Sequence, residues 1–392
     1  MPRTNKLYHY ILFLLFLAVS GGSFFYIHNG RYFVTLFLFM SIILHIYRHK
    51  RFRINENTYF FLGVILYQTF NYLLLNPNHS GNTFLPQIFL FIGSYFFISS
   101  YALIEFKRLY LNSVTIMTVI SLFVYLGYMS GYLPISTIWN GNKSIEYCLL
   151  HCVVGNRLSG IYWEPGAMQI PLNMTLLLYL KEIICWKIEK KDIWKFAIIV
   201  IAVIMTISTA GILWLCLFML YFAFYRLKSR QISVKAAILI IGLFSGAVAV
   251  YYSDMVQDKL QMRTDSSASS MEVRAADNLG LLVLISEKPF FGWGIDSKEM
   301  ARRNEQLNNL TNSNGVLALT SQFGIIFLLF WIFHLIKKMK RFYNKEMVIG
   351  ALLLFLFLNA FEVYWYFPVA LIFHFCVINN RNYNEATPSY IA

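Results

Sequence analysis

The feature that most constrains this chain is a series of apolar stretches that recurs from one end to the other. Stretches of about 17–25 apolar residues can cross a bilayer as helices. Only 13% of the 392 residues are charged, about half the share of a soluble domain, too little to cover a water-soluble surface. The sequence therefore predicts an all-α, polytopic integral membrane protein, one transmembrane domain over residues 1–392 with about twelve spans. The spans are expected near residues 7–27, 32–47, 58–75, 84–104, 113–133, 166–186, 194–208, 210–225, 235–252, 316–336, 346–361 and 363–378.

Basic residues indicate how these spans are oriented. Lys and Arg gather on alternate connections, within residues 48–53, 107–108, 187–195, 226–235 and 337–345. Because Lys and Arg are retained on the cytoplasmic side during insertion, both termini are expected in the cytoplasm. The net charge of +14 then reflects topology and contact with anionic lipid headgroups, and nucleic acid is not an expected partner. The first apolar run lacks a convincing cleavage site and is expected to be a span.

Two connections on the predicted outer side are long, residues 134–165 and residues 253–315. Long ordered loops are usually functional, and tryptophans with Gly and Pro distinguish these two from disordered tethers. We therefore expect the working site at the outer face, between the two loops. Cys148 and Cys152 lie where a disulfide is permitted, with unpaired thiols as the alternative. Together with His151 they offer too few ligands for a metal ion, and no metal or cofactor is expected.

The second loop predicts an amphipathic helix. Ser269 and Glu272 fit a capping box, in which both side chains satisfy free amides at a helix start. The segment MEVRAADNLGLLVLIS follows, with Ala275, Leu279 and Leu282 on one face, and we expect it to lie across the mouth of the bundle. In the segment EKPFFGWG that comes next, Pro289 ends the helix, and Gly292 and Gly294 allow a tight turn beside Trp293.

Arg157 and Glu164 stand in RLSGIYWEPGAM, directly before the span expected at 166–186. Arginine at a bilayer centre costs about 2.5–3.5 kcal/mol, so Arg157 is expected in a loop or polar cavity. There its planar guanidinium can bind phosphate through two parallel hydrogen bonds. Glu164, between Trp163 and Pro165, is a candidate general base because partial desolvation raises a carboxyl pKa. The alternatives are that Arg157 pairs with Glu164 or a lipid headgroup, and that Glu164 is a salt-bridged carboxylate that closes the loop.

Arg274 repeats this pattern in the second loop. Two outer arginines, each beside an aromatic, Gly- and Pro-containing segment, suit a lipid-linked diphosphate. The alternative for Arg274 is an ion pair with Asp277 three residues on, an arrangement that contributes only a few tenths of a kcal/mol, roughly, when exposed.

Aromatic and amide side chains complete the candidate site. The flat faces of Tyr162, Trp163 and Trp293 suit the C–H faces of sugar rings, although Trp and Tyr also populate membrane interfaces without binding a ligand. Asn314, in TNSNG, offers a polar group on the same side of the membrane, although Asn commonly caps helices.

The order of these motifs resembles a known family. It runs from RLSGIYWEPG to STAG in a tight outer turn, then to a long loop with Arg274 and EKPFFGWG, and finally to SNG before VLALTSQFGIIFLLFWIF. This order is similar to that of the O-antigen polymerase and O-antigen ligase superfamily, mainly over residues 150–335. The resemblance implies a metal-independent glycosyltransferase of GT-C-like architecture in the bacterial cytoplasmic (inner) membrane. Its site would be extracytoplasmic, its donor an undecaprenyl-diphosphate-linked glycan, and its partners membrane lipid, a flippase and a chain-length regulator.

Two departures refine the expected activity. Ligases of this superfamily usually carry a histidine where this chain has Ser313, and many members have an arginine in the turn that is STAG here. The first departure favours a polymerase of lipid-linked repeat units, for O-antigen, capsule or exopolysaccharide. Arg157 and Arg274 match the family's loop arginines and would hold the diphosphate, and Glu164 would orient or deprotonate the acceptor hydroxyl.

Two alternatives remain at this point. One is a ligase that transfers finished glycan to another acceptor. The other is a polyprenyl-linked oligosaccharide flippase or transporter, a class that usually shows internal repeats and charges near the bilayer midplane. No repeat of that kind is evident in the sequence, and most of its charges lie in the predicted loops.

Overall fold

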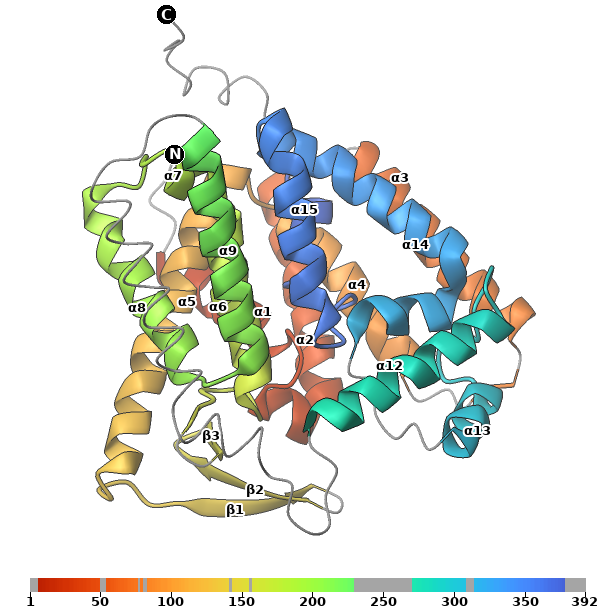
Figure 1. Ribbon diagram of the computed structural model, residues 1–392, viewed down its shortest axis with the longest axis horizontal. Coiled ribbons are helices and arrows are strands. Elements are labelled where there is room, and N and C mark those ends of the chain that lie inside the picture. The colour runs from red at the N-terminus through yellow and green to blue at the C-terminus, as the bar shows by residue number, and fades with distance from the viewer. Residues whose placement is uncertain are drawn as a thin grey trace, which may run out of the picture.

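The computed structural model describes residues 6–49, 54–76, 78–79, 83–140, 143–154, 157–228, 270–307 and 314–377. Within these ranges the chain is mostly helical (Figure 1). The span expected at 235–252 lies outside the described residues. The helices are α1 (Lys6–Ala18), α2 (Phe24–His49), α3 (Glu56–Phe70), α4 (Phe84–Ser99), α5 (Leu103–Met129), α6 (Pro165–Leu178), α7 (Leu180–Ile184), α8 (Ile193–Met205), α9 (Thr209–Lys228), α12 (Ser270–Glu287), α13 (Lys298–Gln306), α14 (Gly315–Phe342), α15 (Lys345–Ala360) and α16 (Ile372–Phe375), with short turns η1 (Asn71–Leu75) and η2 (Lys190–Asp192).

Helices of membrane-spanning length confirm the membrane class. In the described ranges, five segments are long and apolar enough to cross a bilayer: Asn29–His49, Glu56–Leu75, Leu103–Met129, Thr209–Arg226 and Gly315–Phe342. They also expose large apolar side chains, such as Leu36, Phe123 and Phe333. A helix that is apolar on its outer face suits lipid rather than water. The chain is thus a helical membrane protein, and the full count of about twelve spans stays a prediction.

Basic helix ends gather at one end of the molecule, at the top of Figure 1. Arg48, at the end of α2, pairs with Glu105 at the start of α5, N to O 2.7 Å. Lys107 of α5 pairs with Glu182 of α7 at 2.5 Å. Lys337 and Arg341, in the last turns of α14, pair with Glu56 of α3 at 2.9 and 2.5 Å. Segments that the alternation of Lys and Arg assigns to one side therefore lie together.

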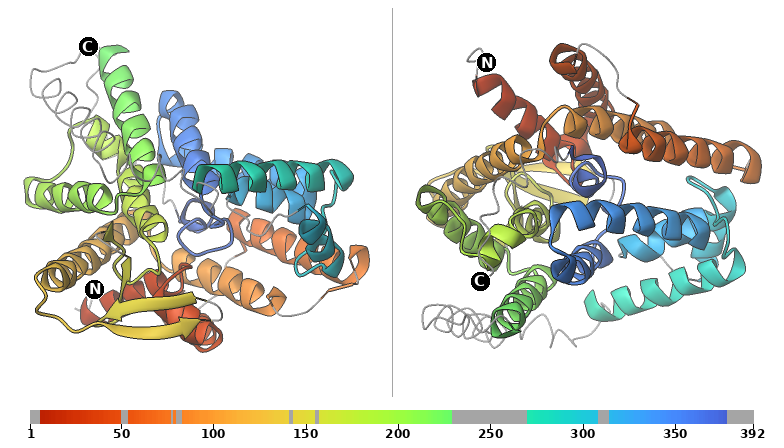
Figure 2. Two further views of the ribbon diagram at one scale, coloured as in Figure 1. Left: turned by 60° about the horizontal axis from the view of Figure 1, so that its bottom comes forward. Right: turned by 90° about the horizontal axis from the view of Figure 1, so that it is seen from above.

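The first long loop corrects the all-α prediction, because it forms an antiparallel sheet. Strands β1 (Ser136–Asn140), β2 (Lys143–Cys148), β3 (His151–Val154) and β4 (Arg157–Leu158) pair in sequence order. The sheet crosses the end of the molecule opposite the basic helix ends (Figure 1, Figure 2 left). Leu149 and Leu150 join β2 to β3 with φ of 45° and 66°, the mirror-image turn that matches strand twist. Alternating β-branched and aromatic residues favour strands here. The all-α prediction followed the long apolar runs and did not take this local pattern into account.

A break in α14 receives the segment EKPFFGWG. Gly324 has φ 80° and ψ 173°, which divides α14 in two. Backbone hydrogen bonds join the two segments at the break. The Ile325 amide of α14 donates to the Pro289 carbonyl (2.8 Å), and the Trp293 amide of the loop donates to the Ser321 carbonyl (2.8 Å). A Cβ on Gly324 would lie 2.0 Å from the Phe290 oxygen. Irregular backbone at membrane depth is tolerated where protein buries it, and here the loop does so.

The segment after α15 corrects the last predicted span, near 363–378. Residues 361–371 form turns, and only α16 is helical. The segment is nevertheless buried, because the Tyr364 hydroxyl donates to the Gly21 carbonyl (3.1 Å) and the Phe367 ring lies against Gly21. Pro368 lacks an amide donor and therefore disfavours a helix interior. The aromatic side chains of the segment are packed although the backbone around them is not helical. The segment therefore wedges into the bundle instead of crossing it as a helix.

Helix α12 confirms the helix predicted in the second loop, and the structure orients its faces. The predicted face is turned outward, since Leu279 and Leu282 are exposed, whereas Asp277, Leu281 and Leu284 are buried. Ser269 of the predicted capping box lies outside the described residues. Helix α12 lies alongside α14 (Figure 2), which brings its first turns toward the segment after α15.

Candidate functional site

The site is built at the start of α6, where Glu164 occupies the N-cap position. Pro165 follows at the first helical position, where its fixed φ suits a helix start. The backbone just before it is anchored to the α1–α2 connection: Phe24 donates to the Ile161 carbonyl (2.7 Å) and Trp163 donates to the Gly22 carbonyl (2.6 Å). This local pairing holds Glu164 at the edge of the bundle, on the side that carries the sheet.

Gly166 explains why the motif continues as Glu-Pro-Gly. A Cβ on Gly166 would lie 2.9 Å from Oε1 of Glu362 and 3.8 Å from Oε1 of Glu164. A side chain at this position would displace the Glu362 carboxylate, so glycine lets the two carboxylates flank this point together. Glu362 comes from the segment after α15, so the glycine joins residues that are about two hundred positions apart.

Arg274, in the first turns of α12, binds the same segment. Its Nη1 donates to the Phe361 carbonyl at 2.9 Å, and its Nη2 lies 3.5 Å from Oε1 of Glu362. The Arg274 side chain is 38% exposed and that of Glu362 is 18% exposed. The cation therefore stabilises a carboxylate on another segment while part of it stays accessible.

Arg157 lies in β4, paired in register with Val154 of β3. It is half-buried, and burial lowers the pKa of the guanidinium while the Glu164 charge raises it. Within the described part of the chain, no carboxylate lies within ion-pair distance of Arg157 and its guanidinium makes no hydrogen bond. A half-buried cation that only a nearby carboxylate offsets is ready to take an anion.

The four charged groups form a series in which each interacts with the next: Arg157, Glu164, Glu362 and Arg274. Burial and the neighbouring Glu164 charge raise the pKa of Glu362 to about 8, although Arg274 opposes that shift. These shifts favour the protonated form of Glu362, and Arg157 and Arg274 supply positive charge on either side of the two carboxyl groups, which suits a diphosphate.

The structure gives the predicted aromatic residues different degrees of burial. Tyr162 is fully buried, and its hydroxyl donates to the Leu17 carbonyl (3.2 Å), so it anchors α1 and offers no face to a sugar. Trp163 is half-buried beside Glu164, with its indole against Gly22. Of the two residues, only Trp163 is partly exposed.

Trp293, Gly292 and Gly294 belong to the break in α14 rather than to the charged series. Trp293 is 8% exposed, and its indole N–H donates to the Leu284 carbonyl at 2.8 Å. The predicted tight turn is confirmed, since φ is 68° at Gly292 and 82° at Gly294. A Cβ on Gly292 would lie 2.4 Å from the Gln322 backbone. These residues pack the loop against α12, α14 and the segment from Asn71 to Asn76, and the structure gives them a packing role.

Asn314 lies beside the charged series but serves as a helix cap. Its Oδ1 accepts from the amides of Val316 and Leu317, both at 3.1 Å. The next residue, Gly315, packs so closely on the segment after α15 that a Cβ there would lie 2.4 Å from the Glu362 carbonyl oxygen. The Asn-Gly pair therefore positions the backbone that carries Glu362.

Glu362 is the site residue that the sequence reasoning missed. It is the one Asp, Glu, Lys or Arg between Glu346 and Arg381. A lone carboxylate in an apolar stretch is costly and marks a functional or paired group. That signal was present in the sequence. The predicted spans at 346–361 and 363–378 left Glu362 in the connection between them, where nothing indicated a partner.

Other candidate chemistry is limited. Cys148 and Cys152 are both free thiols, and burial raises the pKa of Cys152 to about 12. Among the described residues, no group of three or more His, Cys, Asp or Glu side chains could hold a metal ion.

Comparison with known proteins leaves the family open, since no protein-family model matches the chain and no curated protein sequence matches it significantly.

Proposed function

We propose that this protein is a polymerase of polyprenyl-diphosphate-linked oligosaccharide repeat units. The observation that carries the proposal is the charged series, in which two arginines from separate long loops, β4 and α12, interact with adjacent carboxylates at one end of the bundle. Paired guanidinium groups suit the oxygens of a diphosphate. A carboxylate between them suits proton transfer from a hydroxyl.

The proposed step is a single displacement. The acceptor sugar oxygen bonds to the anomeric carbon of the donor glycan as the bond from that carbon to the diphosphate oxygen breaks. The hydroxyl proton passes to the Glu164 carboxylate, and the diphosphate departs with the bonding electron pair. Arg157 and Arg274 stabilise the charge that grows on it. The products are a glycan longer by one repeat and polyprenyl diphosphate, and Glu164 returns its proton to water.

The proposal places the site on the extracytoplasmic side of a bacterial cytoplasmic membrane. The basic helix ends lie opposite the sheet (Figure 1), and the retention of Lys and Arg in the cytoplasm puts the charged series outside. The same rule supports cytoplasmic termini. The substrate would come from a flippase, and a chain-length regulator is the partner to seek.

The test is deletion of the gene followed by complementation, with surface glycan read by gel. We expect the deletion strain to carry acceptor with one repeat unit, and Arg157→Ala and Arg274→Ala to restore few or no long chains. Long lipid-linked glycan that fails to reach its acceptor would indicate a ligase instead. Absence of any repeat unit at the outer face would indicate a flippase. Chains of normal length in the deletion strain would reject the proposal.

A further inference from the structure

The turn between β2 and β3 contains two residues that its backbone conformation does not favour. Leu149 and Leu150 occupy the two central positions, both with positive φ. A turn of this kind favours Asn-Gly, because positive φ is strained for a residue with a bulky side chain. Leu149 is 63% exposed and Leu150 is 47% exposed, so packing inside the protein offsets little of this strain. Strained and exposed leucines point to a contact outside the chain.

Further exposed apolar side chains lie at the same end of the sheet. Ser136 pairs with Tyr147, so Ile135, one residue earlier, lies next to the turn. Ile135 is exposed, and Tyr132, three residues before it, is 87% exposed. Tyrosine is common where a membrane meets water. We call these four residues the apolar sheet end: Tyr132, Ile135, Leu149 and Leu150.

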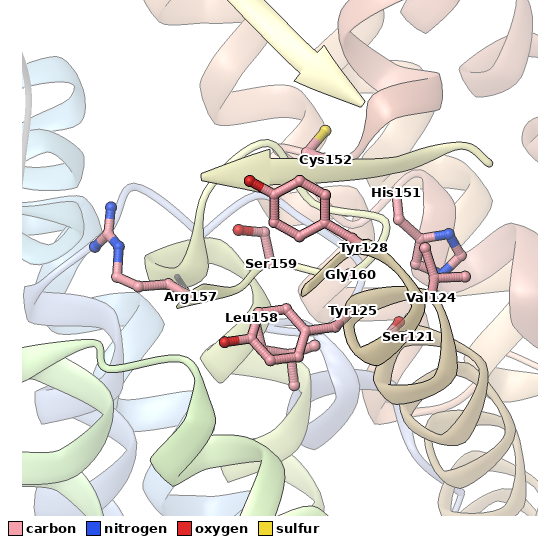
Figure 3. A pocket seen from close by; sticks show the side chains of 10 residues that line it. All are labelled: Ser121, Val124, Tyr125, Tyr128, His151, Cys152, Arg157, Leu158, Ser159 and Gly160. Carbon is pink, nitrogen blue, oxygen red and sulfur yellow. The ribbon is translucent and has the colours of Figure 1, made fainter. Parts of the chain in front are cut away.

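Helix α5 indicates the depth of the apolar sheet end. His151, the first residue of β3, lies beside Val124 of α5, and both line one small pocket (Figure 3). The His151 Nδ1 donates to the Leu149 carbonyl (2.8 Å), which ties the turn to this level. From Leu109, directly after two basic residues, to Met129 the helix rises about 30 Å, the thickness of a hydrocarbon core. The turn therefore lies near the hydrocarbon boundary on the side of the sheet.

The exposed apolar face of α5 reaches the same place. Phe123, Leu126 and Met129 are exposed, on a helix that is long and apolar enough to span a membrane. Such a face suits lipid. The chain after α5 then turns back onto the helix, since a Cβ on Gly127 would lie 2.6 Å from Cδ1 of Leu133. The apolar sheet end is thus continuous with a surface that faces lipid.

We propose that the apolar sheet end is a membrane anchor, whose two leucines insert among the acyl chains of the leaflet on the side of the sheet. Transfer of leucine side chains from water into hydrocarbon is favourable, and it offsets the strain of the turn. Strand β3 pairs with β4, with Val154 opposite Arg157. The anchor therefore holds Arg157 near the level of the headgroup phosphates. That position matters for a lipid-linked diphosphate, and this consequence rests on the proposed function.

The experiment measures depth in the purified full-length protein, in nanodiscs of phosphatidylethanolamine and phosphatidylglycerol. Leu150→Cys carries a bimane label, and its quenching by lipids with a doxyl group near the headgroup is compared with quenching by iodide in water. Phe123→Cys, on the exposed face of α5, is the control for lipid, and Glu305→Cys, on the polar helix α13, is the control for water. Cys185→Ser and Cys216→Ser are present in every variant, because these two cysteines are not fully buried.

The label at Leu150 should be quenched by the doxyl lipid, as at Phe123, and shielded from iodide. Quenching by iodide alone, as at Glu305, would place the turn in water and overturn the inference. Protection from both quenchers would indicate contact with a second copy or another protein and would also overturn it.

A second variant tests whether the leucines hold the sheet end in the membrane. Leu149→Asn with Leu150→Gly gives the turn the residues that it favours, so the fold should be kept. A label on Ile135→Cys should then lose quenching by the doxyl lipid and gain quenching by iodide. Unchanged quenching at Ile135 would overturn the anchor. These measurements need no catalytic activity, so they decide the anchor separately from the glycan-length assays that test the polymerase.

Discussion

Replacing Glu362 with glutamine tests the electrostatics of the site most directly. Glutamine keeps the size of the side chain and resembles the protonated acid. Burial and the Glu164 charge raise the pKa of Glu362 from its ordinary value of 4.5 to about 8. We therefore expect Glu362→Gln to be close to wild type in stability at pH 5 and more stable than wild type at pH 9.

The sign follows from proton binding in the two states. Between pH 4.5 and 8 the folded protein keeps the Glu362 proton while the unfolded chain loses it, so the stability of the wild type falls as pH rises. A shift of one pKa unit corresponds to about 1.4 kcal/mol. The rise from 4.5 to about 8 therefore sets an upper bound of roughly 5 kcal/mol on the stability that the wild type loses between pH 5 and pH 9. The glutamine variant has no such proton to lose and should not show this loss.

The assay is thermal unfolding of both proteins in one detergent, from pH 5 to pH 9. The difference in melting temperature between variant and wild type should grow steadily with pH. Glu305→Gln, an exposed carboxylate on α13, is the matched control and should not show that growth. Parallel curves for wild type and Glu362→Gln would refute the argument that Glu362 is held protonated beside Glu164.

The remaining predictions concern binding, backbone and packing. Arg157→Lys keeps the charge but loses the planar fork, so glycan chains should shorten in a complemented strain, whereas alanine at the ion-paired Arg303 of α13 should leave glycan length normal. Gly324→Ala should lower the free energy of unfolding by at least about 3 kcal/mol, because φ of 80° excludes other residues there, while Gly30→Ala meets only ordinary contacts and should be mild. Trp293→Phe removes the indole donor to the Leu284 carbonyl and should cost about 1–2 kcal/mol by denaturation. Normal glycan length in that variant would confirm that the residue packs a loop, and short chains in a protein of normal stability would contradict it.

Part of the candidate site could be predicted from the sequence. Arg157, Glu164 and Arg274 stand out because charge is scarce in this chain, and Arg157 and Glu164 also stand in a segment with Gly, Pro and aromatic residues. The aromatic residues could not be sorted in the same way. Tyr162 and Trp163 are neighbours, yet one is fully buried and the other half-buried, since burial depends on which segment packs above them.

The sequence also predicted only part of the role of the glycines. Positive φ at Gly292 and Gly294 could be anticipated from a tight turn after Pro289. The partner of that turn could not, because the break at Gly324 lies inside an apolar run that looks continuous. Backbone hydrogen bonds between residues about thirty positions apart carry no local sequence signal.

The sequence by itself determined the class of this protein, because length of apolar run and scarcity of charge act locally on each helix and require lipid around it. The distribution of Lys and Arg along the sequence also predicted that the basic helix ends lie on one side of the membrane and the two long loops on the other. Only the tertiary structure decided that Glu362 joins Glu164 and Arg274, and that the first loop is a sheet with a pocket behind it. The physical reason is that a buried charge is tolerated only beside its partner, and which distant segment supplies that partner is set by how the helices and glycines pack.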